Sequence, residues 1–352
     1  MKTKTAPLKA SAGSRKLKEL GIALPVFPTT SVGSFPKPPE LMEARAKAAR
    51  GLITPNDLVI REKRATEFWI RTQEEIGIDV LVDGEMYRGD MVAYFAEHIP
   101  GFSGGGTVRS YGNRFYKKPV IAGAVRWPGP ITLEWWKFAQ RLTNRPVKGI
   151  LTGPYTVMDW SFNEYYPDRA SACMALADVI RREVEALVAA GAKIIQIDEP
   201  ALSVRPEELD IAIEAMQKVT EGIKAYFITH ICYGAFELIY PRMLKLAVDN
   251  FDLEMSNSDL DLLSLFRKSP FTKDISAGVV DVHSHKVENA SLVKERIRET
   301  CRVIAPEKVW VDPDCGLKTR SVQEAREKLL SLVKAVQSLR PQWTGRNGHS
   351  SR

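Results

Sequence analysis

Short apolar runs recur along the chain, and most of them precede a longer stretch with helical periodicity. This alternation predicts βα units and a parallel sheet. Eight such runs are present, which is the number of strands that closes a TIM barrel. The runs cover residues 25–35, 79–83, 149–158, 193–198, 225–232, 251–256, 275–282 and 308–312. We therefore expect an α/β fold consisting of a single (β/α)8 barrel.

The expected helices between these runs keep apolar residues on one face. The clearest covers residues 170–190, and Gly191 follows it at the position expected for a helix stop. Similar periodicity predicts helices over residues 206–222, 287–304 and 321–338.

Three segments lie outside a minimal barrel. Residues 99–147 hold two glycine-rich turns, alternating runs and a tryptophan-containing helix, so we expect a hairpin and helix excursion between strands two and three. Residues 1–24 are basic and predict a mobile or loosely docked N-terminal arm. The barrel domain is then expected over residues 25–339, followed by a basic C-terminal tail over residues 340–352.

The net charge of +7 belongs to the two ends of the chain. Residues 1–24 carry six basic groups and one acid, and residues 340–352 carry three basic groups and no acid. The remaining body, residues 25–339, is close to neutral. A neutral body does not favour nucleic acid as a partner.

The apolar runs are too short for a membrane span, which needs roughly 18 or more apolar residues. No apolar segment of a secretory signal follows the basic N-terminus. We expect no membrane partner and a cytoplasmic location. The four cysteines are too few and too scattered for a disulfide framework, and Cys173 and Cys301 lie in helical patterns typical of the core.

Every expected strand ends on groups capable of chemistry. In a TIM barrel the active site lies at the carboxyl ends of the strands. Any one of these residues can instead cap the helix that follows, but their recurrence at all strand ends favours a functional site there. They are Gly33 and Ser34, Asp83 and Glu85, Asp159 and Trp160, Asp198 and Glu199, His230 and Cys232, Glu254, Asp281 and His283, and Asp312, Asp314 and Cys315.

His230 and Cys232 are two residues apart on one expected strand, so their side chains should project from the same face. Glu254 and Cys315 add a carboxylate and a second thiolate from other strand ends. One nitrogen, two sulfurs and one oxygen form a tetrahedral set suited to zinc. The alternative is that His230 and Cys232 are ordinary core residues.

These residues carry a resemblance to the catalytic half of cobalamin-independent methionine synthase. The matching strings occur in the family's order at the ends of successive strands and span residues 31–320. They are Val32–Pro36, Asp83–Glu85 with Arg88–Val92, Leu151–Pro154 with Trp160–Phe162, Gln196–Leu202, His230 with Cys232, Asp281–Ser284 and Asp312–Arg320.

The resemblance implies a homocysteine S-methyltransferase, which moves a methyl group to the zinc-bound thiolate of L-homocysteine and forms L-methionine. It implies that the zinc ligands are His230, Cys232, Glu254 and Cys315. It also implies that Glu85 and Asp198 bind the amino group of homocysteine, and that its carboxylate is bound by Val32, Gly33 and Ser34. The implied catalytic residue is His283, which protonates a leaving nitrogen.

The resemblance defines the methyl donor less well than the acceptor. Trp160 matches the aromatic residue that stacks on the pterin and Arg114 a polar contact, but Val204 stands where the family has a pterin-binding glutamate. Family members that use folate carry a second, N-terminal barrel, and 352 residues leave no room for it. The short form therefore favours methylcobalamin, carried by a corrinoid protein that the basic ends would attract. The alternative donor is 5-methyltetrahydrofolate or its polyglutamate.

Two other interpretations remain open. Relatives of this family alkylate other thiols such as coenzyme M, although the paired acids Glu85 and Asp198 suit an amino group better than a sulfonate. A zinc-stabilised scaffold that binds nucleic acid is the other. Its metal ligands would be expected in closely spaced pairs, whereas here they come from separate strand ends.

Overall fold

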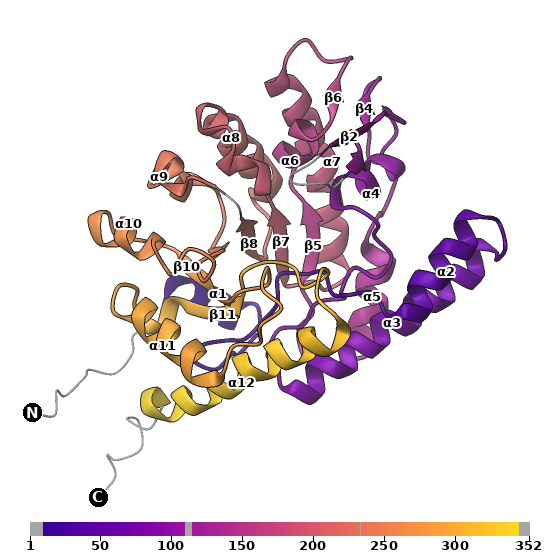
Figure 1. The fold of residues 1–352 in the computed structure, drawn as a ribbon. Helices are drawn as coiled ribbons and strands as arrows, with labels where there is room; N and C mark the ends of the chain where they lie inside the picture. The colour runs from indigo at the N-terminus through magenta and orange to yellow at the C-terminus, as the bar shows by residue number, and fades with distance from the viewer. Residues whose placement is uncertain (1–9, 110–114, 233, 345–352) are drawn as a thin grey trace, which may run out of the picture.

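A computed structural model describes residues 10–109, 115–232 and 234–344 of the chain. At its centre lies a parallel sheet of six strands in the order β11-β10-β9-β8-β7-β5, with helices around it (Figure 1). The strands are Gly149–Thr152 (β5), Ile194–Asp198 (β7), Tyr226–Ile231 (β8), Asn250–Leu253 (β9), Asp274–Val280 (β10) and Val309–Pro313 (β11). All their residues are buried, which explains why they read as continuous apolar runs in the sequence.

The parallel sheet confirms an α/β fold, but two of the eight expected strands are not strands. Residues 25–35 form one isolated parallel bridge, from Thr29 to Val311 on β11. In that segment Pro25 and Pro28 lack a backbone donor and Phe27 has a φ of 54°, so a regular ladder cannot continue.

Residues 79–83 likewise form one isolated parallel bridge, from Leu81 to Val147, just before β5. The backbone N–H groups of Asp79 and Val80 both donate to the carbonyl oxygen of Thr29, at 3.1 and 3.0 Å. The two segments therefore lie beside each other between the edge strands β11 and β5. A closed barrel of eight strands stays a prediction.

The expected helices are present with small shifts at their ends. Residues 170–190 correspond to Arg169–Ala189 (α7), and Gly191 follows with a φ of 105°. The other three expected helices are Leu209–Thr220 (α8), Ala290–Cys301 (α11) and Val322–Thr344 (α12). The remaining α-helices are Ala12–Glu19 (α1), Pro39–Ala49 (α2), Pro55–Ile76 (α3), Met91–His98 (α4), Leu133–Arg141 (α5), Pro154–Asp159 (α6), Phe236–Ile239 (α9) and Leu262–Lys268 (α10). Short 3-10 helices cover Pro200–Ser203 (η1), Pro206–Glu208 (η2), Arg242–Lys245 (η3) and Pro306–Lys308 (η4).

The excursion at residues 99–147 contains the expected hairpin and helix. Thr107–Arg109 (β2) and Phe115–Lys117 (β3) pair antiparallel, and the helix is α5. Phe102–Ser103 (β1) and Val120–Ile121 (β4) also pair antiparallel, and β4 pairs with Phe162–Asn163 (β6), which follows α6. The excursion therefore lies beside the carboxyl end of β5, at the upper right of Figure 1.

The expected N-terminal arm is packed where it is described. The helix α1 places Leu17 in a buried cluster with Tyr226 and Trp310, and the Nζ of Lys16 lies 2.7 Å from the carboxylate of Asp249. Residues 11–22 are therefore docked on the sheet, and the mobile or loosely docked arm expected over residues 1–24 stays a prediction, because residues 1–9 lie outside the described part.

The expected C-terminal tail also begins inside a helix. Arg340 belongs to α12, and its guanidinium donates to the carbonyl oxygens of Val26 and Phe27 at 3.0 Å. Residues 345–352 lie outside the described part, and the domain boundaries stay predictions. Among the described residues no helix has the length and apolar character to span a membrane.

Candidate active site

Three of the four predicted zinc ligands come together at the carboxyl end of the sheet. His230 lies on β8, Cys232 directly follows it, and Cys315 follows β11. One nitrogen and two sulfur atoms from these residues all lie within 4.8 Å of one another, and the two sulfurs are 4.0 Å apart. This set of donors can hold a metal ion.

A neighbouring carboxylate fixes the orientation of His230. Its Nδ1 lies 2.9 Å from Oδ1 of Asp252, which is buried on β9, and its buried Nε2 has no hydrogen-bond partner among the described residues. The side chain of Cys232, followed by that of His230, lowers the pKa of the Cys315 thiol well below its usual value. The pocket therefore favours a thiolate beside the imidazole of His230.

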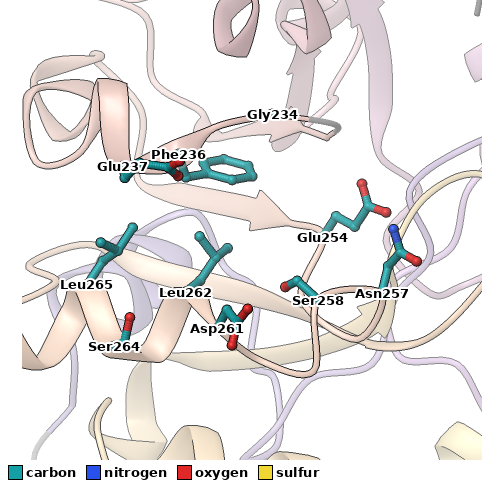
Figure 2. Close-up of a pocket in the computed structure, with 10 residues that line it drawn as sticks. All are labelled: Gly234, Phe236, Glu237, Glu254, Asn257, Ser258, Asp261, Leu262, Ser264 and Leu265. Atoms are coloured by element: carbon teal, nitrogen blue, oxygen red, sulfur yellow. The ribbon is translucent and has the colours of Figure 1, made fainter.

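Glu254, the fourth predicted ligand, does not join this group of atoms. Its Oε1 lies 3.1 Å from Nε2 of His283, and this hydrogen bond raises the pKa of His283. Glu254 also lines a cavity of about 430 Å³ between α9 and α10, with Asn257 close to it (Figure 2). Its role as a metal ligand stays a prediction.

Glu85, one of the two predicted acids for the amino group, lies in a strained turn. Gly84 and Glu85 have φ values of 80° and 57°. The turn brings the carboxylate against Gly33, where a Cβ would lie 3.2 Å from Oε1 of Glu85. Oε1 also lies 3.1 Å from Nη1 of the buried Arg88, so the carboxylate is held in place.

Asp198, the other predicted acid, ends β7. Its Oδ1 accepts a hydrogen bond from Nε2 of Gln196 at 2.8 Å, and the same amide donates to the carbonyl oxygen of Val32 at 2.7 Å. Burial raises the pKa of Asp198 to about 7. A cationic group placed beside this acid would favour its ionised form.

The predicted carboxylate-binding turn, Val32 to Ser34, also contacts the loop of Cys315. The carbonyl oxygen of Ser34 accepts a hydrogen bond from the Leu317 N–H at 2.8 Å. A Cβ on Gly316 would lie 2.1 Å from Oγ of Ser34, so any larger residue there would force the Ser34 side chain to move. The turn therefore links the two carboxylates to the sulfur-containing group.

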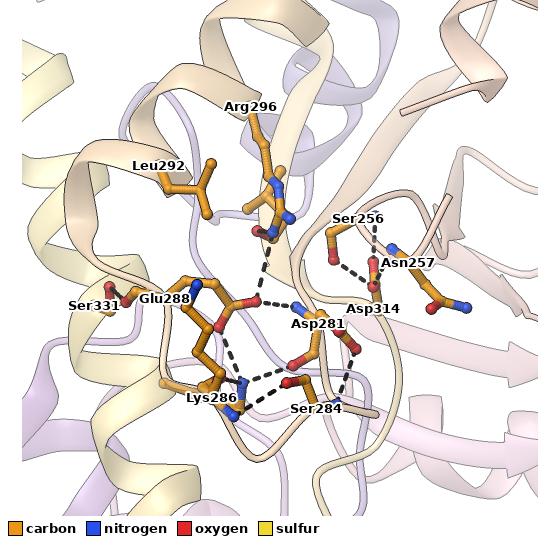
Figure 3. A network of polar contacts seen from close by, with 12 residues as sticks. Ser256, Asn257, Asp281, Ser284, Lys286, Glu288, Leu292, Arg296, Asp314 and Ser331 are labelled. Carbon is orange, nitrogen blue, oxygen red and sulfur yellow. Dashed lines mark hydrogen bonds and ion pairs between the residues drawn. The ribbon is translucent and has the colours of Figure 1, made fainter. Parts of the chain in front are cut away.

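His283 lies in the loop between Asp281 and Glu288, which an ion pair between Lys328 and Glu288 supports; Figure 3 shows Asp281, Ser284 and Glu288 of this loop. The His283 N–H donates to Oδ1 of Asp281 at 2.7 Å. The fully buried Lys328 of α12 donates to the carbonyl oxygen of Asp281 at 2.7 Å and to Glu288 at 3.0 Å. Glu288 in turn accepts from the Asp281 N–H at 2.7 Å. Sequence reasoning missed Lys328 and Glu288, because their pairing requires the tertiary structure.

Two acids that the sequence proposed for chemistry have structural partners instead. Glu199 accepts from the N–H groups of Tyr155 and Thr156, at 3.1 and 2.7 Å, at the start of α6. Asp314 accepts from the N–H groups of Met255, Ser256 and Asn257, at 2.8 to 3.0 Å, in the loop after Glu254. Asp252 was missed, although it is two residues before Glu254 and therefore on the same face of the chain.

Of the residues predicted to bind the methyl donor, Trp160 is half-buried and directly follows α6. Arg114 lies outside the described residues. Val204 is 51% exposed after η1. Trp160 lies on the excursion side of the sheet, where β6 pairs with β4.

Residues 27–338 match the family described as the catalytic domain of cobalamin-independent synthase. The chain belongs to this family. It is 42% identical over 338 residues to a 5-methyltetrahydropteroyltriglutamate–homocysteine methyltransferase of Chelativorans sp. (strain BNC1), covering 93% of this chain and 44% of the relative. The enzyme of the same name from Flavobacterium johnsoniae is also 42% identical, with 94% and 44% covered. The chain thus spans less than half the length of these curated relatives.

Solved structures of the cobalamin-independent synthase family have the same fold. A B12-independent methionine synthase of Shewanella sp. W3-18-1, in complex with selenomethionine, superposes with a TM-score of 0.80 at 27% identity, covering 91% of this chain and 99% of that one. A putative B12-independent methionine synthase of Listeria monocytogenes gives a TM-score of 0.75 at 21% identity, covering 90% and 99%. The second likeness shows the fold alone.

These comparisons do not support the preferred donor. The family is described as cobalamin-independent, and the relatives are named for a methyltetrahydropteroyltriglutamate donor. Methylcobalamin as donor, and with it a corrinoid carrier protein as partner, is therefore corrected in favour of the folate alternative. The expectation rested on the chain length and on Val204 in place of a pterin-binding glutamate, and neither feature identifies a corrinoid donor.

Proposed function

We propose that the chain transfers a methyl group from a 5-methyltetrahydrofolate polyglutamate to the sulfur of L-homocysteine and so forms L-methionine. The observation that carries this proposal is the group formed by His230, Cys232 and Cys315, together with the carboxylates of Glu85 and Asp198. The names of the relatives support both the donor and the acceptor. The selenomethionine bound by the Shewanella enzyme supports methionine as the product.

Zinc fits the donor atoms that are present. One imidazole nitrogen and two sulfurs suit zinc, and Nε2 of His230 is a buried polar atom with no partner among the described residues. We assign Glu254 as the fourth ligand. When bound, zinc supplies the Lewis acidity that favours the thiolate form of an incoming thiol at neutral pH.

The chain's own residues orient homocysteine. Its ammonium group is placed between the carboxylates of Glu85 and Asp198, and its carboxylate contacts the turn formed by Val32, Gly33 and Ser34. Since Arg88 and Gln196 hold the two acids, the substrate meets a preformed site. A sulfonate in place of the amino group would face two like charges, which argues against coenzyme M as the acceptor.

His283 provides the proton that the donor requires. The bond between the methyl carbon and the folate nitrogen breaks while the carbon–sulfur bond forms, and the amine nitrogen leaves with a proton. His283 is 31% exposed, and its hydrogen bond to Glu254 raises its pKa, which favours the protonated form. We assign Trp160 to stacking on the pterin and Arg114 to a polar contact with it.

For the architecture, we propose that residues 25–339 form one (β/α)8 barrel domain. The support is that residues 25–35 and 79–83 bridge to β11, to each other and to the residues before β5.

The direct test offers zinc-loaded protein L-homocysteine with 5-methyltetrahydropteroyltriglutamate and measures methionine by mass spectrometry. We expect methionine from the wild type, none above background from Cys315→Ser, and a normal rate from Cys301→Ser, which changes a half-buried thiol on α11. Failure of the wild type to form methionine, with zinc bound in stoichiometric amount, overturns the proposal.

A further inference from the structure

Lys148 is a buried lysine that the proposed function does not use, and it lies beneath the predicted site for the amino group. It directly precedes β5. The strands β5 and β7 pair in parallel, with Ile150 opposite Gln196. Since side chains alternate along a strand, Lys148, Gln196 and Asp198 project from the same face of the sheet. They form a column that rises toward the carboxyl ends of the strands.

A chain of hydrogen bonds joins the members of this column. The Nζ of Lys148 donates to Oε1 of Gln196 at 2.5 Å. On the other side of the same amide, Nε2 of Gln196 donates to Oδ1 of Asp198 at 2.8 Å and to the carbonyl oxygen of Val32 at 2.7 Å. Gln196 thus contacts both predicted parts of the homocysteine site, the acid for the amino group and the turn for the carboxylate.

The orientation of the Gln196 amide follows from the chemistry of its partners. An ammonium group can only donate hydrogen bonds, so the amide oxygen faces Lys148. A carbonyl oxygen and an ionised carboxylate can only accept, so the amide nitrogen faces Val32 and Asp198. All three partners agree on one orientation. Both hydrogens of the amide nitrogen are therefore directed at the homocysteine site, and the amide oxygen is held from below.

Packing alone does not explain a lysine at this position. Moving an ammonium group from water into the interior costs free energy, and a methionine would fill a similar volume without that cost. Burial lowers the pKa of Lys148, although the charges of Asp252 and Asp312 oppose this. Among the described residues, the hydrogen-bond partner of its Nζ is a neutral amide rather than a carboxylate. The contact with Gln196 is therefore the feature that accounts for the lysine.

We propose that Lys148 is a positioning residue for the amino acid substrate, because it holds the Gln196 amide that fixes Asp198 and the turn of Val32. This rests on the proposed function, in which Asp198 binds the amino group of homocysteine and the turn binds its carboxylate. Since one amide contacts both parts, their spacing is fixed before the substrate binds. A fixed spacing favours ligands that carry both groups over ligands that lack either one.

The test measures binding of L-methionine to the zinc-loaded protein by isothermal titration and compares it with two analogues. γ-Methylthiobutyrate lacks the amino group, and γ-methylthiopropylamine lacks the carboxylate. We expect the wild type to prefer L-methionine over both. Gln196→Met should lower each preference by about tenfold or more, the value of a hydrogen bond to a charged group. Lys148→Met should lower each by about threefold or more, as for residues coupled in one hydrogen-bond network.

The double variant, Lys148→Met with Gln196→Met, separates this role from other effects of the lysine. If Lys148 acts through Gln196, the double variant has the same preferences as Gln196→Met alone. It also leaves no unpaired ammonium group in the interior, so it should show the tenfold loss even if Gln196→Met alone does not fold. Effects that add in the double variant, or wild-type preferences in Lys148→Met, overturn the inference.

Lys273→Met is the matched control. Lys273 is half-buried directly before β10, at the end of the sheet opposite the site, and its Nζ donates to the carbonyl oxygens of Leu246 and Val248 at 3.3 and 2.7 Å. This variant should keep both preferences. A purely structural role of Lys148 would weaken binding of all three ligands equally in Lys148→Met, which also overturns the inference.

The inference and the proposed function are separable. A wild type that forms methionine but binds L-methionine no better than the two analogues overturns the inference alone. A wild type that forms no methionine, but whose preference for L-methionine falls in Lys148→Met as expected, overturns the proposed function and supports the positioning role.

Discussion

At the residue scale, the groups assigned to chemistry are each held by a second side chain. Asp252 orients His230, Arg88 holds the carboxylate of Glu85, and the side chain of Asp281 accepts from the His283 backbone. Such support fixes the positions of reacting groups before substrate arrives, which lowers the entropy lost on binding. The precision of the site therefore depends on residues that touch neither substrate nor metal.

Replacing Asp252 by asparagine tests this for the metal group. The amide oxygen of the new side chain can still accept a hydrogen bond from Nδ1 of His230, but it lacks the charge that makes the imidazole a better ligand. We expect zinc affinity to fall by about tenfold to 100-fold, measured by competition with a chelator of known affinity. Asp274→Asn changes a buried acid at the other end of the sheet and should not alter the affinity. Equal affinities in wild type and Asp252→Asn would show that Asp252 is not a supporting residue.

Replacing His283 by asparagine tests the proton transfer. With a folate donor the leaving nitrogen needs a proton, so we expect kcat to fall by about 100-fold or more, with little change in the KM for homocysteine. The methylcobalamin donor first expected would have made this loss small. His285→Asn is the control, because His285 lies on the same loop but is 77% exposed and pairs with Glu324. A small loss in His283→Asn would assign the proton to another group.

At the element scale, the loop from Asp281 to Glu288 depends on α12. Lys328 is fully buried and donates to the carbonyl oxygens of Asp281 and Lys286 and to the carboxylate of Glu288. Without Lys328, the buried Glu288 would retain only the more distant Arg296, at 3.5 Å, as a cationic partner among the described residues.

We therefore expect Lys328→Met to lower the free energy of unfolding by about 3–5 kcal/mol and to increase amide hydrogen exchange over residues 281–288. Lys334→Met, on an exposed face of the same helix, should do neither. Adding Glu288→Gln to Lys328→Met should recover part of the stability, because no unpaired buried charge remains. If the loop exchanges no faster in Lys328→Met, then α12 does not hold it.

Element-scale prediction from the sequence worked where local pattern decides the structure. The apolar period and Gly191 predict α7 correctly, because the backbone hydrogen bonds of a helix lie within one segment and its packing requires one apolar face. Residues 25–35 were expected as a strand, yet Pro25, Pro28 and the left-handed Phe27 interrupt the ladder. The prolines were visible in the sequence and should have restricted that expectation.

The site was predictable only in part, because a local pattern places residues at strand ends but does not show what each side chain contacts. Ligand and substrate residues lie at strand ends, where the sequence order places them on one edge of a parallel sheet. The same pattern cannot separate an acid that faces the site from one that accepts backbone N–H groups, as Glu199 and Asp314 do. The role of Lys328 depends on distant partners, Asp281 and Glu288, which no local pattern reveals.

At the scale of the whole molecule, α1 covers the end of the sheet opposite the site. Ser11 and Tyr226 both donate to Oδ2 of Asp274, the first residue of β10, at 3.3 and 2.9 Å. A Cβ on Gly13 would lie 1.9 Å from the same oxygen, so the helix packs tightly there. The described part of the basic N-terminal segment therefore lies away from the carboxyl ends of the strands.

Asp274 makes this packing sensitive to pH. Burial raises its pKa from 3.8 to about 6, so the folded state favours the neutral acid. Its contribution to stability is fully present below pH 3.8 and is lost as the pH rises through about 6. Asp274→Asn keeps an oxygen acceptor for Tyr226 and cannot ionise, and it should therefore gain stability relative to the wild type as the pH rises.

We expect the difference in unfolding free energy between Asp274→Asn and wild type to grow by about 2–3 kcal/mol in favour of the variant between pH 4 and pH 7, as measured by urea unfolding at several pH values. The contributions of the other titrating groups are common to both proteins, so they cancel in the difference between the two unfolding free energies. Asp210→Asn, whose side chain is 71% exposed, should show a nearly constant difference from the wild type. A constant difference for Asp274→Asn as well would mean that Asp274 ionises in the folded protein as easily as in the unfolded chain, and that burial beneath α1 does not control its proton.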